Sequence, residues 1–287
     1  MAGTRPDRRV APLLLAAVLL AAFSTPVLAQ PDPASLSSPL DPDSYRLDAR
    51  FLDRFALDVG TAISSPARWR GSDWVGFGLA VGAGLAVFAA DEDLYGFVQD
   101  GKTSFTQSLQ PFVSKTGNGG YLAGFAGLLY LGGEIFDSRP LRRTAVLSLE
   151  SFVAASAVVF VLKAVVGRAR PYADEGPTSF HPFSFRGRYA SFASGDAAGA
   201  FAVAAVVAGT SDSVFVDVLA FGLAGLAAVY RVHDGKHWPS DVVAGSLIGL
   251  FLGRKIVALD EKKGRGKAGL DCTVTVGFPG LGLSLRF

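Results

Sequence analysis

Long apolar stretches with almost no charges constrain this chain more than any other feature. Six of them, each 15 to 23 residues long, lie between Trp74 and Leu259. A helix needs about 17–25 residues to cross a bilayer, so most of these stretches are long enough to span one. We therefore expect an all-α fold dominated by a membrane-embedded bundle of about six helices. The stretches are Trp74–Ala90, Tyr121–Phe136, Thr144–Val166, Gly195–Gly209, Val214–Tyr230 and Ser240–Leu259.

The composition is typical of a membrane protein. Charged residues make up 18% of the chain, below the roughly 25% of a soluble domain. Core helices of a soluble all-helical domain are the alternative, but the near absence of charges over six stretches favours a membrane. A net charge of +2 gives no case for nucleic-acid binding. Cys272 is the single cysteine, which excludes an intrachain disulfide.

The N-terminus has the pattern of a secretory signal peptide over residues 1–29. Arg5, Arg8 and Arg9 precede an apolar run, and small or modest residues precede Gln30. The pattern predicts cleavage near Gln30. An uncleaved membrane anchor of similar length is the alternative.

The rest of the chain divides into three regions. Residues 30–73 are expected to hold a linker and an amphipathic helix, because apolar residues recur at every fourth position within Asp43–Ile63. That helix can lie on the membrane interface or pack on the bundle, and the sequence favours neither. Residues 74–259 would form the helical membrane domain. Residues 260–287 carry a basic segment and an alternating tail around Pro279-Gly280, which predicts a short C-terminal β-hairpin.

The strongest chemical signal lies between the fifth and sixth stretches, where Arg231, His237 and Asp241 occur. Asp241 can accept a hydrogen bond from one imidazole nitrogen, which would leave the other nitrogen free as a nucleophile. Arg231 offers a forked guanidinium suited to phosphoryl oxygens. A purely structural His–Asp bond is the alternative, but ionisable pairs in or near a membrane are usually functional.

Two further clusters precede this one. Lys163 and Arg170 follow the third stretch, where Pro171 disfavours a continuing helix. Alone they would be read as cations that anchor a helix end. Ser194 and Gly195 open the fourth stretch, and free amides at a helix N-terminus bind anions such as phosphate. If the stretches form helices of similar length, all three clusters meet at one end of the bundle.

Together the clusters resemble the motifs of the type 2 phosphatidic acid phosphatase and vanadium haloperoxidase superfamily, in its membrane lipid phosphatase branch. The family patterns are Lys-x6-Arg-Pro, Pro-Ser-Gly-His and Ser-Arg-x5-His-x3-Asp, which this chain follows in order from Lys163 to Asp241. The resemblance implies that His237 attacks phosphorus and forms a phosphohistidine while Asp241 orients it. It implies no metal and no cofactor. The phosphate-binding residues it implies are Lys163, Arg170, Ser194, Gly195 and Arg231.

Three residues depart from the family patterns. Ala193 and Tyr230 are tolerable replacements, but Asp196 stands where the family has the histidine that protonates the leaving group. An ionised aspartate repels phosphate and gives no proton, whereas a protonated one can act as the acid. His233 is a possible substitute. We therefore expect a membrane phosphatase of reduced or specialised activity on a phospholipid or prenyl phosphate, or an impaired relative that binds phosphate or phospholipid headgroups.

Other interpretations are weaker. A haloperoxidase would hold vanadate in the same pocket, but such enzymes are usually soluble. His233, His237 and Asp241 have a spacing that could bind a metal, yet Pro239 disturbs that helix face. The aromatic and basic loop Tyr172–Ala193 suits either a lipid headgroup or a membrane interface. A structural envelope protein whose tail contacts a partner is a third class.

The expected orientation contains a conflict. The resemblance places the pocket on the periplasmic side of a bacterial-type cell envelope, and basic residues in the loops opposite the pocket agree with that. A cleaved signal peptide followed by six spans would instead turn the pocket inward. We favour the loop charges over the span count. These basic residues are Arg139, Arg142, Arg143, Arg254, Lys255, Lys262, Lys263, Arg265 and Lys267.

Overall fold

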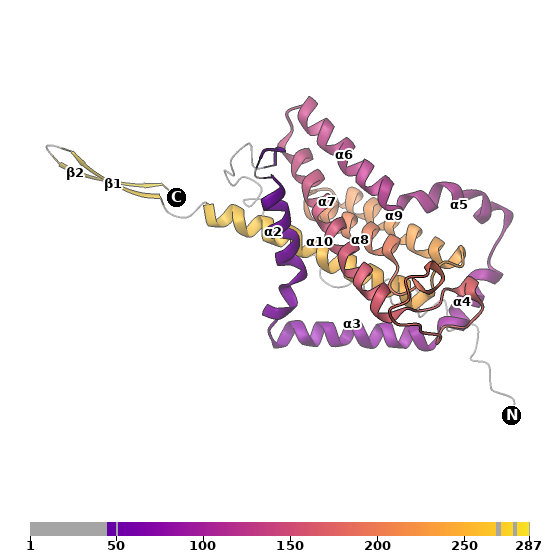
Figure 1. The fold of residues 1–287 in the computed structure, drawn as a ribbon. Coiled ribbons are helices and arrows are strands. Elements are labelled where there is room, and N and C mark those ends of the chain that lie inside the picture. Colours follow the sequence, from indigo (N-terminus) through magenta and orange to yellow (C-terminus); the bar gives the residue numbers. More distant parts are fainter. Residues whose placement is uncertain (1–44, 50, 268–270, 278–279, 287) are drawn as a thin grey trace.

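A computed structural model describes residues 45–49, 51–267, 271–277 and 280–286, with side chains up to residue 263. The signal peptide and the linker expected at residues 1–42 lie outside these residues. Nine α-helices occur in the described part (Figure 1). They are α2 (Phe51–Ile63), α3 (Gly71–Ala89), α4 (Asp91–Asp100), α5 (Ser104–Thr116), α6 (Gly119–Ile135), α7 (Arg139–Val166), α8 (Gly195–Gly209), α9 (Val214–His233) and α10 (Pro239–Lys267).

Shorter elements complete the described chain. Three 3-10 turns are η2 (Ser65–Arg68), η3 (Pro171–Ala173) and η4 (Gly187–Tyr189). The tail forms an antiparallel pair of strands, β1 (Asp271–Gly277) and β2 (Gly280–Arg286). The sequence alternation predicts a hairpin of this kind. The region before it differs from the expectation, because α10 continues through the basic segment to Lys267 instead of ending at Leu259.

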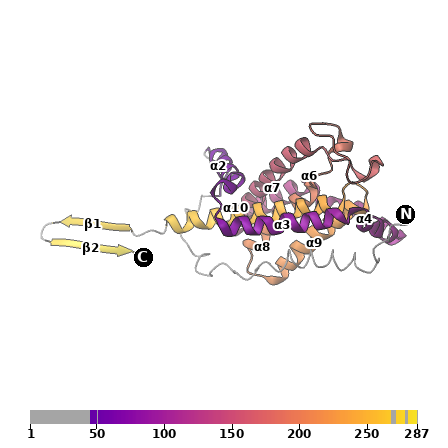
Figure 2. The same ribbon diagram turned by 90° about the horizontal axis from the view of Figure 1, so that it is seen from below.

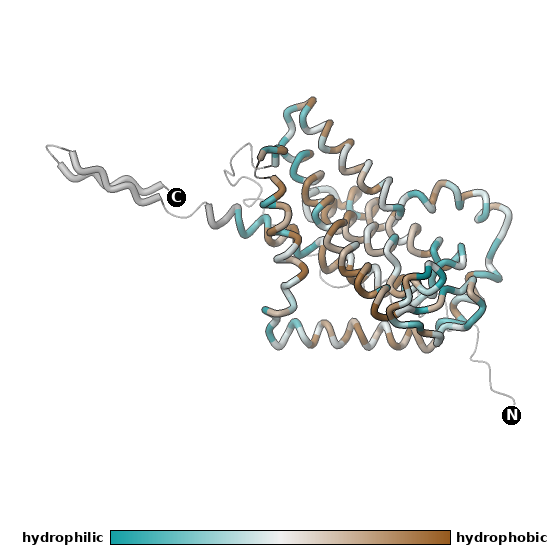
Figure 3. The backbone as a smooth tube through the Cα atoms, in the orientation of Figure 1, coloured by the Kyte–Doolittle hydropathy of each residue, from teal (hydrophilic) through white to brown (hydrophobic). Residues whose placement is uncertain are grey.

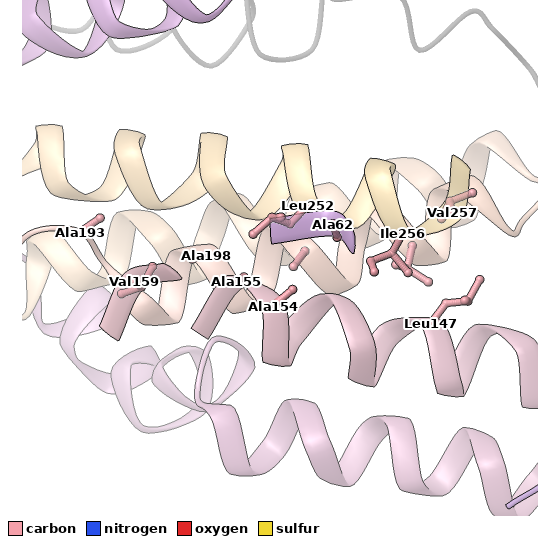
Figure 4. Close-up of a cluster of buried hydrophobic side chains, with 12 residues drawn as sticks. Ala62, Leu147, Ala154, Ala155, Val159, Ala193, Ala198, Leu252, Ile256 and Val257 are labelled. Atoms are coloured by element: carbon pink, nitrogen blue, oxygen red, sulfur yellow. The ribbon is translucent and has the colours of Figure 1, made fainter. Parts of the chain in front are cut away.

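Helix α8 lies at the centre of the bundle and packs against α7, α9 and α10. It is 15 residues long, and the ten residues Ala197–Val206 are all buried. Figure 4 shows part of the core, in which Ala154 and Ala155 of α7 lie near Ala198 of α8 and Leu252 of α10. Small side chains let these helices approach closely. A helix enclosed in this way does not need the length of one that faces lipid.

The prediction of about six membrane-spanning helices differs from the structure, in which four described helices meet the length and composition of a span. In the described residues, four helices are long and apolar enough to cross a membrane: Gly71–Ala89, Arg139–Val166, Val214–His233 and Pro239–Lys263. Helix α6, with 17 residues, and helix α8, with 15, are shorter than these four. The protein is thus an integral membrane protein with several candidate spans. Apolar residues follow the bundle, and polar residues gather in the connecting segments (Figure 3).

Helix α2 is amphipathic but begins at Phe51, later than expected. It packs against α7 and α10 through Ala62 and Val59. The structure therefore favours packing on the bundle over an isolated interfacial helix. Its outer face keeps large apolar side chains exposed, since Leu52 is 74% and Leu57 68% exposed.

The segment between the first and second apolar stretches holds two further helices, α4 and α5. Helices α4 and α5 are amphipathic and pack against α9. Helix α3 runs beside α10 and leads into α4 (Figures 1 and 2). This arrangement brings Asp91, the first residue of α4, into contact with the start of α10.

Candidate functional site

The three sequence clusters meet at one end of the bundle, as expected. Helices α7 and α9 end there, and α8 and α10 begin there (Figure 1). Gly167 ends α7 in the left-handed conformation, with φ of 58°, which glycine adopts without strain. The chain then returns towards α8, and Ser194 donates its backbone N–H to the carbonyl oxygen of Asp241 at 2.9 Å. This bond ties the start of α8 to the start of α10.

His237 is buried between α9 and α10, and its hydrogen bond differs from the expected one. Its Nδ1 lies 2.8 Å from the backbone carbonyl oxygen of Ser191 and 4.0 Å from the carboxylate of Asp241. A carbonyl oxygen only accepts, so Nδ1 of the neutral ring carries the proton. The lone pair is therefore on Nε2. The imidazole is held in one orientation, and its direct partner is Ser191.

Asp241 is fully buried and holds the loop around His237. Its Oδ2 accepts from the Trp238 backbone N–H at 2.9 Å and from Ser191 Oγ at 2.5 Å. Its Oδ1 accepts from Arg168 Nη1 at 2.7 Å. Both carboxylate oxygens are thus occupied. Asp241 is linked to His237 through Ser191 and makes no short contact with the ring.

Three cations approach the same region. Lys163 Nζ donates to the Ala190 carbonyl at 2.6 Å, and Arg170 Nη2 lies 3.4 Å from the same oxygen. Arg231 Nη2 donates to the Ser114 carbonyl at 2.8 Å. The Nε atoms of Arg170 and Arg231 are buried and have no partner within the described residues. Buried donors normally have an acceptor, so the unpaired Nε atoms indicate that this region binds an anionic ligand.

The electrostatic environment of His237 links it to these cations. Burial lowers the pKa of His237 well below its usual range, and the nearby charges of Lys163, Arg170 and Arg231 lower the pKa further. The ring is therefore neutral at physiological pH. A neutral imidazole surrounded by positive charge is suited to attack a bound anion.

The start of α8 faces the same cluster. Ser194 is fully buried, and its Oγ accepts from the Ala197 N–H at 3.4 Å as an N-cap. A Cβ added to Gly195 would lie 4.0 Å from Cε of Lys163, so its backbone is close to that side chain. The amide end of the helix is thus beside a cation of the cluster, where an anion benefits from both.

Asp196 pairs with a cation of the site. Its Oδ2 lies 3.0 Å from Nη1 of Arg231, and its side chain is 29% exposed. The carboxylate therefore occupies a position on the guanidinium where a phosphoryl oxygen would otherwise bind. The carboxylate is thus held against Arg231.

His233 is turned towards α5 instead of towards His237. Its Nε2 lies 3.3 Å from Thr106 Oγ1, and Nδ1 lies 3.5 Å from Asp234. The ring also packs on Tyr230, with centroids 5.0 Å apart. These contacts give no support to His233 as a substitute acid. No cluster of three metal-ligating side chains occurs in the part of the chain that the structure describes.

Three buried polar residues behind the site were not predicted from the sequence: Asp91, Arg168 and Ser240. Arg168 is 1% exposed and donates to Asp91, Asp241, Ser240 and the Pro177 carbonyl. Asp91 also accepts from the N–H and Oγ of Ser240, at 2.8 and 2.6 Å. The sequence carries only a weak signal for this network. Arg168 sits among cations that suggest a helix anchor, and Asp91 opens an acidic run.

An apolar cavity of about 350 Å³ lies beside the site, between α6, α8 and α9. Ala200, which lines it, follows Asp196 by one helical turn on α8. Val203, Ala204 and Val207 continue the same wall along α8. The cavity therefore begins one helical turn from Asp196 and extends along α8.

Comparisons with known proteins show which family and which solved structures the chain resembles. The PAP2 superfamily matches residues 144–265. A transmembrane PAP2-type phosphatidylglycerolphosphate phosphatase from Bacillus subtilis shares the fold, with a TM-score of 0.50 and 22% identity over 74% of this chain and 94% of that one. LpxE from Aquifex aeolicus gives a TM-score of 0.47 and 22% identity over 59% of this chain and 94% of its own. No curated protein matches the sequence.

Proposed function

Because this chain is a relative of the PAP2 superfamily of membrane lipid phosphatases, through its residues 144–265, we propose that it hydrolyses a lipid phosphate or diphosphate through a phosphohistidine. One observation carries the proposal. His237 presents a free Nε2 beside three cations, and two of these cations have buried Nε atoms without a partner. A site of this kind binds a phosphoryl group and places a nucleophile next to it.

The proposed reaction has two displacements. Lys163, Arg170 and Arg231 bind the phosphoryl oxygens, helped by Ser194 and the Gly195 amide. His237 Nε2 attacks phosphorus, a P–N bond forms, and the P–O bond to the lipid breaks. Water then attacks the phosphohistidine, so that the P–N bond breaks, inorganic phosphate leaves and the ring becomes neutral again. The charges on the three cations offset the negative charge of the transition state.

Asp196 limits the first displacement. Paired with Arg231, it does not supply the proton that an alkoxide leaving group needs, and a missing general acid costs about 10²–10⁴ in rate. When the substrate is a diphosphate, the leaving group is the lipid monophosphate, which is a weaker base than an alkoxide and needs less help. We therefore expect lipid diphosphates to be turned over faster than lipid monophosphates.

The apolar cavity supports a lipid substrate. A cavity of about 350 Å³ beside the cluster has room for part of an acyl or prenyl chain. A phosphate with no apolar chain would leave it empty. The proposed substrate class is therefore a phospholipid or prenyl phosphate taken from the membrane.

We also propose a periplasmic site. Helix α7 has 28 residues, which separates its basic start from the site at its end by about 42 Å. Lys255, Lys262 and Lys263 lie towards the far end of α10. An excess of cations at one end marks that end as cytoplasmic, which leaves the site on the opposite side.

Asp196 favours a second candidate, a relative that binds phosphate or lipid headgroups without turnover. The test measures phosphate release from phosphatidate and from a prenyl diphosphate by protein purified in detergent. We expect wild type to release phosphate and His237→Ala to release none. His181→Ala is the control, because His181 pairs with Glu175 on the outer loop. Equal rates for wild type and His237→Ala would reject the enzyme, and tight phosphate binding without release would establish the second candidate.

A further inference from the structure

The buried network behind the site has one cation, Arg168, bonded to two carboxylates. Arg168 Nη2 lies 2.6 Å from Asp91 and Nη1 lies 2.7 Å from Asp241, and all three side chains are at most 1% exposed. Its Nε donates to the Pro177 carbonyl at 2.8 Å. Asp91 comes from α4 and Asp241 from α10, so the guanidinium joins distant parts of the chain. Every side-chain nitrogen of Arg168 has a partner, which fixes its position.

Two sets of hydrogen bonds connect Arg168 to His237, and both pass through Ser191. Its guanidinium holds Asp241, which accepts from Ser191 Oγ. Its backbone carbonyl accepts from the Ser191 N–H at 3.1 Å. The carbonyl of Ser191 is in turn the partner of His237 Nδ1. Ser191 is thus held on two sides before it orients the ring.

We propose that Arg168, anchored by Asp91, is a positioning residue for His237. It holds Asp241 and Ser191 so that the imidazole keeps its proton on Nδ1 and its lone pair on Nε2. It also balances the charge of Asp241, which lies 4.0 Å from the ring. The inference rests on the proposed function only for its kinetic consequence, because the state of the ring can be measured without turnover.

The charged groups around His237 determine what the loss of Arg168 would do. Lys163, Arg170 and Arg231 face the ring from α7, from the loop and from α9. Asp241 faces it from α10 and is held away by Arg168. Without the guanidinium, Asp241 loses its Oδ1 partner, and the carboxylate can turn towards Nδ1. The pKa of His237 would then rise, since a nearby carboxylate stabilises the imidazolium.

The experiment uses ¹⁵N-histidine spectra of the full chain in detergent. The chain has three histidines, so the spectrum of His237→Gln identifies the His237 signals. We expect wild type to show a neutral ring protonated on Nδ1. In Arg168→Lys the ring should titrate at higher pH, because one ammonium group cannot replace bonds to four partners. Asp91→Asn is the second variant, in case Arg168→Lys does not fold.

Arg142→Lys is a matched control. Arg142 is also a buried arginine, at 3% exposed, but it bonds Gly133 and Asp137 at the other end of the bundle. The Arg142→Lys variant should leave the His237 signals and kcat unchanged. Arg168→Lys should lower kcat about 10²-fold with little change in KM. Unchanged His237 signals in folded Arg168→Lys and Asp91→Asn would overturn the inference. If wild type releases no phosphate, the proposed function fails while the spectra still decide the role of Arg168.

Discussion

Asp196 gives the sharpest prediction, because its ion pair with Arg231 competes with the phosphate that the site is proposed to bind. The two side chains are 29% and 6% exposed, and their closest atoms are 3.0 Å apart. An exposed pair contributes about 0–1 kcal/mol, whereas a hydrogen bond to a charged group contributes about 1.5–3 kcal/mol. This pair is mostly buried on the Arg231 side and partly exposed on the Asp196 side, so its contribution lies between these ranges. We expect about 1–2 kcal/mol, which phosphate must overcome to reach Arg231.

Asp196→Asn removes the charge at almost constant volume. If the pair is worth about 1–2 kcal/mol, its loss strengthens phosphate binding by about 5–30-fold. The turnover of phosphatidate should not rise, because an amide gives no proton. Asp196→His supplies a general acid, and we expect its kcat for phosphatidate to increase by about 10²-fold or more. A diphosphate substrate should gain less, since its leaving group needs less protonation.

The assay combines phosphate release with inhibition by inorganic phosphate, in detergent and at fixed ionic strength. Asp217→Asn is the control, because Asp217 is a carboxylate on the same helix as Arg231, about 21 Å away along α9. Phosphate inhibition that is no tighter in Asp196→Asn than in wild type would refute the competition. A loss of about 10²-fold in kcat for Asp196→Asn would instead identify Asp196 as the working acid.

Two further predictions concern pH and packing. Burial and the nearby cations lower the pKa of His237, so Nε2 stays unprotonated in mild acid. In a pH profile of kcat/KM, the midpoint of the acidic limb should therefore lie below the usual histidine pKa of about 6.5. A midpoint above about 6.5 would contradict a buried ring that faces cations. Gly249→Ala should destabilise the protein by about 1–3 kcal/mol, because a Cβ there would lie 2.9 Å from the backbone nitrogen of Ala202 on α8. Thermal unfolding in detergent checks this against Gly225→Ala, where nothing lies within 4 Å, and equal melting temperatures would refute the close approach.

The sequence predicts the long helices well because their signal is local. Each apolar stretch lies within one helix or extends one residue past its end, and the stretch Gly195–Gly209 coincides with α8. Helices α4 and α5 were missed because their apolar faces are interrupted by charges and by Pro111. The burial of α8 was missed too. An apolar helix enclosed by other helices has the same composition as one that faces lipid.

The site shows the same limit. Residues in the three clusters were found because their spacing within the chain carries the signal. The Arg168 network was not found, because Arg168 is 77 residues from Asp91 and 73 residues from Asp241 in the sequence. The partner of His237 was also misassigned. Spacing brings Asp241 near the ring, but only the fold shows that Ser191 lies between them.

The fold also sharpens the orientation conflict. Tyr45 and Arg143 both bond Asp260, and Lys263 bonds Asp58, so the segment before α3 lies at the basic end of the bundle. The site lies at the other end. A segment delivered outside by a cleaved signal peptide would therefore turn the site inward. The chain passes from the basic end of the bundle, where Tyr45 lies, to the end that holds the site. Signal cleavage and a periplasmic site therefore exclude each other.

Cys272 allows these two orientations to be distinguished. It is the single cysteine, and it follows α10 at the basic end. If the site is periplasmic, a membrane-impermeant thiol reagent should label Cys272 only after the membrane is opened. A Cys272→Ser, Phe185→Cys variant reports the other side, because Phe185 is 82% exposed in the loop over the site, and it should be labelled in closed spheroplasts. The reverse pattern would place the site in the cytoplasm and reject the assignment from loop charges, because the cations at the far end would then lie outside.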